Sequence, residues 1–303
     1  MKTLILGMGV QGKKRQVFCK KDFVGFVDPI NKLADWTDIQ QVPINSYDAV
    51  LACIPDLEKD KVLKFCIQNK KHVLIEKPLF IQDKILKKYI KEIEKSNIIC
   101  YVAYNHRFEP HFVRLKKLLD TNKLGKIYSC RMFYGNGTAR LVRNSLWRDQ
   151  GNGVLGDLGS HLIDTSKFFF NDLLSKKWVI VDKHKFENKS LDHCVIINSS
   201  KNFRIELEMT MLMWRNHFTC DILAEKGTAH ISSLCKWGPS KFIYRKRRLP
   251  SGIPNEEKRV LVKADPTWEV EYNYFKKLIK ERKKTDLNWQ LKINKILSQL
   301  SKD

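Results

Sequence analysis

The sequence contains no apolar run long enough to cross a bilayer. Its longest apolar runs, around Leu74 and Ile99, are far shorter than the roughly 20 residues that a membrane span needs. The opening segment MKTLILGMGV has one early lysine and a brief apolar run, but glycines interrupt it before the core of a signal peptide could form. We therefore expect a cytoplasmic protein that does not associate with membranes.

Closely spaced cysteine pairs are also absent. The eight cysteines lie far apart between Cys19 and Cys235, and no CxxC pair occurs. Most of them stand inside apolar stretches, which favours buried, reduced thiols in a reducing compartment over a disulfide framework. The sequence has neither an HExxH motif nor a cluster of cysteine and histidine, so we expect no metal site.

Acidic residues are few compared with basic ones, 33 against 56, which gives a net charge of +23. Such an excess favours anionic partners such as nucleic acid, acidic lipid or a phosphorylated small molecule. The lysines are spread over the expected helix surfaces, whereas a nucleic-acid footprint is clustered and rich in arginine. The densest basic cluster, YRKRR at Tyr244–Arg248, can equally be one exposed strand end. Nucleic-acid binding is therefore a minor hypothesis, and we expect no nucleic-acid partner.

The chain is long enough for two domains, and its composition is that of a globular protein, with 43% hydrophobic and 29% charged residues. In the first hundred residues, five short apolar segments alternate with helical patterns. This alternation predicts a doubly wound parallel sheet. The five expected strands are TLILG, FVGFVD, YDAVLACIP, HVLIEKP and NIICYVAY.

The glycine motif GMGVQG follows the first expected strand. Gly7, Gly9 and Gly12, with Val10 and Gln11 between the last two, fit GxGxxG. The first glycine permits a tight turn, the second lets the backbone approach a pyrophosphate, and the third lets helix and strand pack closely. The alternative is a glycine-rich turn that binds no ligand. The position directly between a strand and a helix favours dinucleotide binding.

Asp28 ends the second expected strand. A carboxylate at this place can accept hydrogen bonds from the adenosine ribose and would repel a 2′-phosphate, which favours NAD over NADP. Alternatively, Asp28 caps a turn before Pro29. NADP is therefore not excluded.

The strand HVLIEKP runs into Glu76, Lys77 and Pro78. In an open α/β sheet the ligand lies beyond the carboxyl ends of the strands, so this segment delivers Lys77 to the cofactor crevice. A lysine there can hydrogen-bond a reacting hydroxyl and stabilise developing negative charge. The alternative for an isolated EKP is a strand end whose lysine only faces water.

The second half of the chain carries GNGVLGDLGSHLID. Asp157, His161 and Asp164 stand at i, i+4 and i+7, which predicts that one helix face presents all three. The glycines before them let the backbone approach cofactor and substrate, and a carboxylate one turn away can orient and tune a histidine. The alternative is an ordinary helix start with Asp157 as its cap and His161 as a core histidine.

The segment before these glycines, ARLVRNSLWRDQ, is an expected substrate loop. Arg140 and Arg148 offer forked donors for phosphate or carboxylate, and Trp147 offers a flat face for a sugar or base. A solvated basic loop is the alternative for each arginine. Further along, FRIELEMT and five other segments alternate as strands do, which predicts a sheet with one packed face and one polar or partner-facing side.

Several of these segments together resemble one family. GMGVQG, the CIP after the third strand, IEKP, YNHRF and GNGVLGDLGSHLID are similar, in order and spacing, to the Gfo/Idh/MocA family of NAD(P)-dependent oxidoreductases. WEVEYNYFKKLIK near the end also resembles that family, so the likeness covers nearly the whole chain. GxGxxG and EKP are individually common, whereas their combination with GxxxDxGxHxxD is specific.

The resemblance implies a Rossmann domain, here 1–104, followed by an α+β domain, here 105–303, with a large, open, mostly antiparallel sheet. It implies that Lys77, Asp157 and His161 surround the reacting carbon. A homodimer or homotetramer formed through the second sheet is also implied. The expected cofactor-side residues are Gly7, Gly9, Val10, Gln11, Gly12, Asp28, Ile54, Pro55, Glu76, Lys77, Asn105, His106 and Arg107.

The chain departs from the family pattern in two places. Between Asp28 and YDAV there is room for little more than one small helix, in the region that normally encloses the adenosine. Lys59 stands where many relatives carry a histidine.

The resulting hypothesis is hydride transfer between NAD and a hydroxyl or keto carbon of a sugar, nucleotide-linked or otherwise anionic. His161 would remove the hydroxyl proton, Lys77 would hydrogen-bond the same oxygen, and Asp157 would orient the substrate or the lysine. Asp164 would support His161 or a substrate hydroxyl. Arg140, Trp147 and Arg148 would also bind the substrate. The alternatives are an inositol or free-polyol dehydrogenase and a non-catalytic, dinucleotide-sensing regulator.

Overall fold

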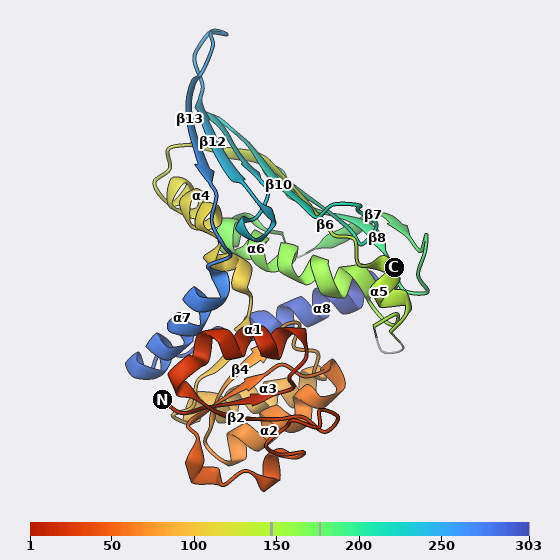
Figure 1. Cartoon of the computed structure of the whole chain (residues 1–303). Helices are drawn as coiled ribbons and strands as arrows, with labels where there is room; N and C mark the ends of the chain where they lie inside the picture. Colours follow the sequence, from red (N-terminus) through yellow and green to blue (C-terminus); the bar gives the residue numbers. More distant parts are fainter. Residues whose placement is uncertain (146–147, 176, 303) are drawn as a thin grey trace. The chain divides into compact units, whose positions relative to one another are not determined.

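The structure is a computed structural model that describes residues 1–145, 148–175 and 177–302 (Figure 1). The chain forms two compact units, Met1–Asn105 with Thr267–Asn294, and His106–Pro266 with Lys295–Asp303. The sequence pattern did not indicate that Thr267–Asn294 returns to the first unit. The domain boundary at 104/105 stays a prediction. Among the described helices, none has the length and apolar character of a membrane span.

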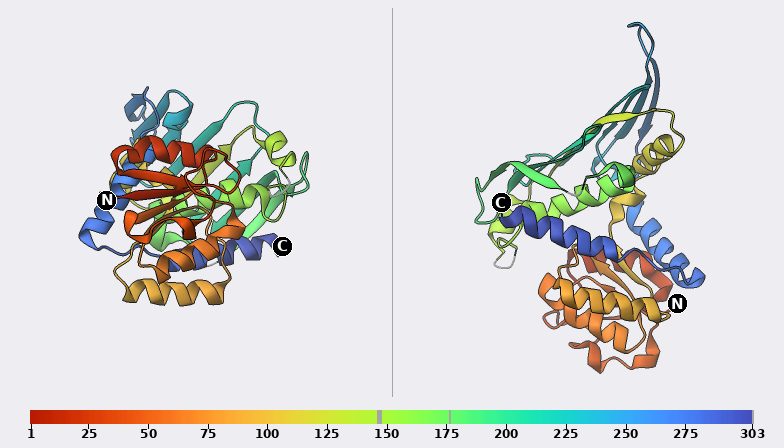
Figure 2. Two further views of the ribbon diagram at one scale, coloured as in Figure 1. Left: turned by 60° about the horizontal axis from the view of Figure 1, so that its bottom comes forward. Right: turned by 180° about the vertical axis from the view of Figure 1, so that it is seen from behind.

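The first unit is built on a parallel sheet with the strand order β2-β1-β3-β4-β5. Helix α1 covers one face of this sheet, and α2 and α3 cover the other (Figure 2). Every residue of β1, β3 and β5 is buried, because both faces are covered. The predicted doubly wound parallel sheet is confirmed. The strands are β1 Thr3–Leu6, β2 Phe23–Val27, β3 Ala49–Ala52, β4 His72–Glu76 and β5 Cys100–Ala103.

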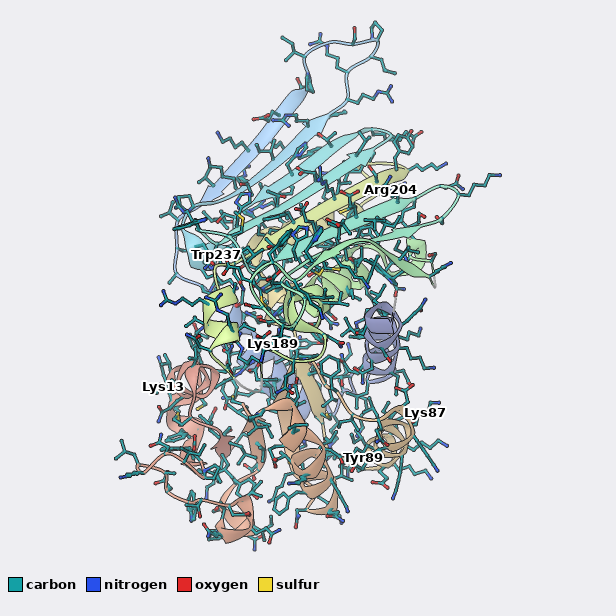
Figure 3. All side chains as sticks on the ribbon, turned by 90° about the vertical axis from the view of Figure 1, so that its right-hand side faces the viewer. Lys13, Lys87, Tyr89, Lys189, Arg204 and Trp237 are labelled. Atoms are coloured by element: carbon teal, nitrogen blue, oxygen red, sulfur yellow. The ribbon has the colours of Figure 1, made fainter. Side chains whose placement is uncertain are left out.

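The helices of this sheet are α1 Val10–Cys19, α2 Lys59–Gln68 and α3 Asp83–Lys95. Helix α3 shows why they form, since its apolar residues recur at helical spacing and are buried. Lys87 and Tyr89 lie on different sides of α3, the lysine exposed and the tyrosine buried (Figure 3). Between β2 and β3 there are only two short 3₁₀ helices, η2 Ile39–Gln41 and η3 Ile44–Ser46. This agrees with the short segment expected there.

Helix α7, Thr267–Glu281, belongs to the first unit because it packs against α1. Tyr272 donates a hydrogen bond to the Asp22 carboxylate at 2.9 Å and shares one with the Thr3 hydroxyl at 3.1 Å. Lys276 forms an ion pair with Asp22 at 2.5 Å. Phe275 is fully buried. These contacts between positions some 250 residues apart fix the helix on the sheet.

The second unit contains an eight-stranded sheet with the order β13-β12-β11-β10-β6-β9-β8-β7. Its neighbours are antiparallel except for β6 and β9, which are parallel, so the predicted large, mostly antiparallel sheet is confirmed. The strands are β6 Ile127–Gly135, β7 Trp178–His184, β8 His193–Ser199, β9 Arg204–Thr210, β10 His217–Ala224, β11 Gly227–Ser232, β12 Ser240–Lys246 and β13 Asn255–Leu261.

Helices α4 Pro110–Asp120 and α6 Ser160–Phe170 lie along one face of the eight-stranded sheet (Figures 1 and 2). On β9, Ile205, Leu207 and Met209 face these helices and are buried, whereas Arg204 is exposed on the opposite face. The predicted alternation of FRIELEMT is therefore confirmed. The unit also contains α5 Ala139–Arg143, and α8 Asn288–Lys302 ends in it.

The edge strand β13 is absent from the sequence prediction. Its residues are charged or polar and exposed almost throughout, so it carries no apolar alternation. It forms because β12 offers an unpaired edge, along which Arg245 pairs with Glu256 at 2.8 Å. Part of the basic YRKRR cluster is thus the end of a strand paired with an acidic neighbour. All eight cysteines are free, and seven of them are buried.

Candidate active site

In the glycine turn between β1 and α1, Gly7 and Gly12 pack closely against backbone atoms, whereas Gly9 does not. A Cβ atom on Gly7 would lie 2.4 Å from the Cys53 carbonyl oxygen, and one on Gly12 would lie 2.0 Å from the Gly7 carbonyl oxygen. Gly7 also has φ +82°, a left-handed conformation that disfavours other residues. At Gly9, in contrast, no atom of the described residues lies within 4 Å of the added atom. The turn therefore packs tightly behind Gly7 and Gly12 and leaves space in front of Gly9.

Helix α1 begins at this open side. Gly9 provides no side-chain cap, and the first turn of α1 carries no acidic residue. The free N–H groups and the positive end of the helix dipole can therefore receive an anion. Val10 and Gln11, the predicted neighbours of the cofactor, are exposed in this first turn. Ile54 is half-buried and contacts the turn near Gly7, and Pro55 is exposed after β3.

Asp28 stabilises the same turn from the end of β2. Its carboxylate accepts hydrogen bonds from the backbone N–H groups of Met8 at 2.9 Å, Ile30 at 3.0 Å and Asn31 at 3.0 Å. Partial burial would raise the pKa of Asp28, but these three hydrogen bonds outweigh it and lower the pKa. A carboxylate has about four acceptor sites, so one stays available to a ribose hydroxyl.

These features fit a dinucleotide. The space beside Gly9 suits a pyrophosphate, the uncapped helix end suits its charge, and Asp28 suits a ribose.

The carboxyl end of β4 is fixed by a buried ion network. Arg15 of α1, 2% exposed, donates to the Glu76 carboxylate from Nε at 3.0 Å and from Nη2 at 2.8 Å. The same Nη2 lies 2.7 Å from the Glu271 carboxylate of α7. The Trp268 ring lies 4.5 Å from the Arg15 guanidinium carbon. Arg15 thus ties the helix after the glycine turn to the residue before Lys77.

Glu271 is completely buried in this network. Burial raises its pKa to about 7, although the Arg15 charge opposes the shift, and the Glu76 charge adds to it. Tyr101 donates a hydrogen bond to Glu271 at 3.2 Å. This network could not be predicted from the sequence, because Arg15 stands in a run of basic residues that suggests an exposed helix face.

Lys77 and Pro78 are positioned by Lys59. The Lys59 side chain is buried and donates to the Pro78 carbonyl oxygen at 2.7 Å, and it pairs with Asp56 at 2.6 Å. Burial lowers the pKa of Lys59, and the Asp56 charge opposes that shift. Lys77 itself is half-buried and joined to Pro78 by a cis peptide bond. The residue that replaces the family's histidine therefore holds the backbone next to the predicted catalytic lysine.

The YNHRF segment divides between the two units. Asn105 ends the first unit, and its side chain donates to Thr267 at 2.8 Å. His106 and Arg107 lie in the second unit. Arg107 donates from Nε to the Asp164 carboxylate at 2.7 Å and forms a second, short contact to its other oxygen. Arg107 and Asp164, two predicted site residues, therefore form a bidentate ion pair, in which the Asp164 carboxylate is buried.

The glycine segment of the second unit is held by close backbone contacts. Gly153 has φ +48°, and a Cβ atom there would lie 2.2 Å from the Leu191 carbonyl oxygen. Asp149 accepts hydrogen bonds from the N–H groups of Lys189 at 3.1 Å and Ser190 at 2.8 Å. Lys189 lies in the connection between β7 and β8 and is labelled in Figure 3. These contacts position the chain that leads into Asp157.

Asp157 lies in a π-helical turn, Leu155–Gly159, that precedes α6. The helix expected through Asp157, His161 and Asp164 is therefore a π-helical turn up to Gly159 and α-helical from Ser160, and the shared face stays a prediction. The Asp157 side chain in the π turn is 37% exposed, whereas His161 and Asp164 on α6 are buried. Gly159 permits the turn to lie against β9, since a Cβ atom would lie 2.8 Å from Met209 Sδ.

His161 stacks on His106. The two ring centroids are 4.0 Å apart and the planes differ by 18°. The Tyr134 ring of β6 lies 5.4 Å from His106 and 6.2 Å from His161, and Phe112 packs against His106 at 6.2 Å. The predicted proton acceptor thus sits among aromatic rings that fix its plane.

The expected substrate loop is placed only in part. Arg148 Nη2 lies 3.7 Å from the Asp157 carboxylate, so the structure brings these two predicted residues together. Arg140 is exposed on α5. Trp147 lies outside the described residues.

The residues that sequence reasoning missed in the second unit are Lys236 and its neighbours. Lys236 Nζ lies 3.3 Å from the Tyr134 hydroxyl and 4.5 Å from the centroid of the Trp237 ring. Trp237 in turn packs against Tyr134 at 5.6 Å. The only sequence signal was a lysine next to a tryptophan in the loop after β11, which by itself is uninformative.

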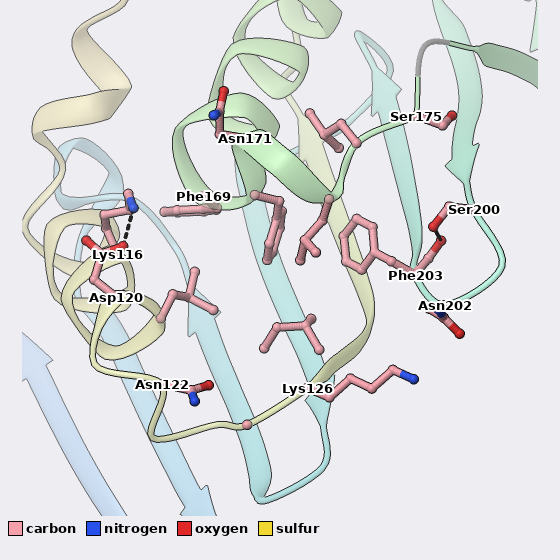
Figure 4. Close-up of a pocket in the computed structure, with 16 residues that line it drawn as sticks. Lys116, Asp120, Asn122, Lys126, Phe169, Asn171, Ser175, Ser200, Asn202 and Phe203 are labelled. Atoms are coloured by element: carbon pink, nitrogen blue, oxygen red, sulfur yellow. Dashed lines mark hydrogen bonds and ion pairs between the residues drawn. The ribbon is translucent and has the colours of Figure 1, made fainter.

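A separate hollow of about 700 Å³ lies elsewhere in the second unit (Figure 4). It is lined by Phe169, Phe170 and Phe203, with Lys116 and Lys126 among its polar residues. None of the predicted site residues that the structure describes lines it. Within the described residues, no group of three or more histidine, cysteine, aspartate or glutamate side chains could hold a metal ion.

Comparison with known proteins identifies both halves of the chain. Residues 6–104 match the model of an oxidoreductase family with an NAD-binding Rossmann fold, and residues 112–230 match the Gfo/Idh/MocA C-terminal domain. Glucose-6-phosphate 3-dehydrogenase of Bacillus subtilis is 29% identical over 42% of this chain, and myo-inositol 2-dehydrogenase of Thermotoga maritima is 32% identical over 28%. These alignments span only 38% and 25% of the two relatives.

Solved structures share the fold over the full length. Levoglucosan dehydrogenase in complex with NADH superposes with a TM-score of 0.81 at 17% identity, covering 100% of this chain and 96% of that protein. An oxidoreductase of Agrobacterium radiobacter in complex with NAD⁺, L-tartaric acid and magnesium has a TM-score of 0.80 at 14% identity, covering 98% and 94%. The two domain matches, the glycine turn and the DxGxH segment together show that this chain belongs to the Gfo/Idh/MocA family of oxidoreductases.

Proposed function

We propose that this protein is an NAD-dependent dehydrogenase that oxidises a CH–OH group of a sugar, or reduces the corresponding carbonyl. The observation that carries the proposal is the glycine turn, in which Gly7 and Gly12 are packed and only Gly9 faces open space. A chain of this family that had lost its cofactor would have no need to keep that space. The intact Lys77, Asp157 and His161 favour catalysis over a regulator that only senses the dinucleotide.

The bound nicotinamide would supply the hydride chemistry. His161 removes the proton of the reacting hydroxyl, and the stacked His106 fixes the plane of its ring. Lys77 donates a hydrogen bond to the reacting oxygen and stabilises its negative charge. Asp157 orients the substrate, and Arg148 beside it restrains the carboxylate. Asp164 pairs with Arg107 and so acts by positioning that side chain.

Asp28 supports a preference for NAD. A 2′-phosphate near this carboxylate would meet a negative charge that is kept ionised by three backbone hydrogen bonds. Titration of the protein with NADH and NADPH by fluorescence checks this preference. Tighter binding of NADPH would contradict it.

For the substrate, we propose a sugar that carries an anionic group, nucleotide-linked or otherwise. Arg140 and Arg148 supply the cationic donors that such a group needs. One relative is named glucose-6-phosphate 3-dehydrogenase, which supports this class. Others are named for myo-inositol and levoglucosan, so a neutral polyol is the alternative.

The test is turnover followed at the absorbance band of reduced nicotinamide. The purified protein is assayed with NAD⁺ and NADP⁺ against sugar phosphates, nucleotide sugars, uronates, inositol and free sugars. Lys77→Met and His161→Asn should each reduce kcat by about 100-fold or more while NADH binding is retained. Turnover close to wild type in both variants would contradict the assigned roles. Binding of NADH without turnover of any substrate would favour the sensor.

We also propose that the open face of the eight-stranded sheet joins two or four copies of the chain. Val179, Leu223 and Val260 are exposed on the face opposite α4 and α6. Light scattering of the wild type and of Leu223→Asp measures the oligomeric state. A monomeric wild type would contradict this proposal.

A further inference from the structure

The loop after β11 places a lysine beside the histidine pair. Cys235–Trp237 form a short 3₁₀ turn, and the Lys236 side chain reaches the Tyr134 hydroxyl at 3.3 Å. Tyr134 is 4% exposed and packs against both His106 and His161. A single aromatic ring therefore separates the Lys236 ammonium group from the predicted proton acceptor.

The Lys236 ammonium group is held in place but not neutralised. It lies over the Trp237 ring at 4.5 Å and over the Tyr134 ring at 5.6 Å, which are cation–π distances. In the part of the chain that the structure describes, it forms no ion pair within 4.0 Å. An ammonium group has three donors, and the Tyr134 hydroxyl takes one. Two donors remain for another partner.

Three carboxylates, Asp265, Glu109 and Asp157, act on the Lys236 ammonium group through their charges, and the last two have other partners. Glu109 is buried and accepts the Cys235 N–H at 3.3 Å, so it holds the loop in place. Asp157 lies 3.7 Å from Arg148. Lys236 is an exposed residue, so an incoming anion can reach the ammonium group that the two aromatic rings and the Tyr134 hydroxyl hold in place.

We propose that Lys236 is a specificity-determining residue that binds the anionic group, a phosphate or a carboxylate, of the substrate. Trp237 and Tyr134 hold its ammonium group in position before the substrate binds. This inference rests on the proposed dehydrogenase function and assigns the anion to Lys236 in addition to Arg140 and Arg148. It also predicts which members of the substrate panel are turned over well.

The kinetic test compares matched substrates and matched variants. Glucose 6-phosphate and glucuronate are each compared with glucose, in the wild type, Lys236→Met and Lys236→Arg. Lys241→Met, at an exposed lysine of β12, is the control. Lys236→Met should raise KM for the anionic sugar by about 10- to 100-fold with little change in kcat, which is the size of a lost charged hydrogen bond. Lys236→Arg should restore most of the affinity, and KM for the neutral sugar should not change.

A binding test does not depend on turnover. Inorganic phosphate is titrated while tryptophan fluorescence is recorded, because an anion that draws the ammonium group from the Trp237 ring alters its emission. The wild type and Lys241→Met should give a saturable response that Lys236→Met lacks. Thermal unfolding of each variant verifies that it is folded.

The outcomes separate the inference from the proposed function. Equal phosphate binding by wild type and Lys236→Met, or a wild type that turns over glucose better than its anionic derivatives, overturns the role of Lys236 and leaves the dehydrogenase intact. If the protein binds phosphate only when Lys236 is present but turns over no sugar, the result supports the anion site and contradicts the proposed dehydrogenase function.

Discussion

Replacing Gly9 with alanine isolates the contribution of the open glycine to dinucleotide binding. Gly9 has φ −68° and ψ −160°, a conformation that alanine adopts without strain, and its added methyl group would meet nothing within 4 Å. We therefore expect the free energy of unfolding to change by less than about 1 kcal/mol, and in the stabilising direction. The methyl group would occupy the space in which the pyrophosphate approaches the helix.

The expected loss appears in binding. Displacing a phosphate from the helix N–H groups removes one or more charged hydrogen bonds, which corresponds to about 10- to 100-fold weaker NADH binding. NADH fluorescence titration measures the affinity, and thermal unfolding of the unliganded protein measures the stability. The two readouts together show whether the change acts on the ligand or on the fold.

Gly12→Ala is the matched control. Its Cβ atom would lie 2.0 Å from the Gly7 carbonyl oxygen, so backbone has to move. We expect a loss of about 1–3 kcal/mol of stability from this overpacking. If Gly9→Ala binds NADH as tightly as the wild type while Gly12→Ala is destabilised, the dinucleotide does not pass over Gly9, and the reasoning is refuted.

Three further predictions concern the groups that position the site. Arg107→Met should destabilise the protein by about 2–3 kcal/mol in urea unfolding, because the buried Asp164 carboxylate loses a bidentate partner; an unchanged midpoint would contradict this. Gly153→Ala should lower both Tm and kcat, because its φ of +48° and the 2.2 Å approach to a backbone oxygen force the chain before Asp157 to move; normal kcat would show that Asp157 does not depend on this turn. Because the pKa of Glu271 is raised from 4.5 to about 7 in the folded protein, its contribution to stability is complete below about pH 4.5 and is lost as the pH rises through 7. Unfolding measured from pH 4 to 8 should therefore show a loss in the wild type that Glu271→Gln lacks, and parallel curves would exclude this role.

Local patterns were sufficient where each element carries its own signal. The strands β1, β3 and β5 are short apolar runs buried on both faces, and β9 alternates strictly, so periodicity identified them. Strand β13 has no such pattern, because it is exposed and forms only along the edge that β12 offers. Helix α7 is amphipathic in sequence, but nothing local indicates that it packs against α1.

The candidate site divides in the same way. The glycine turn and Asp28 could be predicted, since backbone conformation and strand order dictate those residues locally. Arg15 could not, because a basic residue in a basic helix suggests exposure until Glu76 and Glu271 are brought to it. The π turn that contains Asp157 could not be predicted either, because the i, i+4 spacing indicates an ordinary α-helix.

Strand periodicity and turn conformation are local properties of the chain, so the two sheets apart from β13, the glycine turn and the residue types of the site could be predicted from the sequence. The pairing of charges required the folded chain: Arg107 pairs with Asp164, Arg15 pairs with two carboxylates, and Lys236 contacts aromatic rings without an ion pair among the described residues. The physical reason is that the interaction energy of a charged group depends on its burial and on neighbouring groups that are distant along the chain.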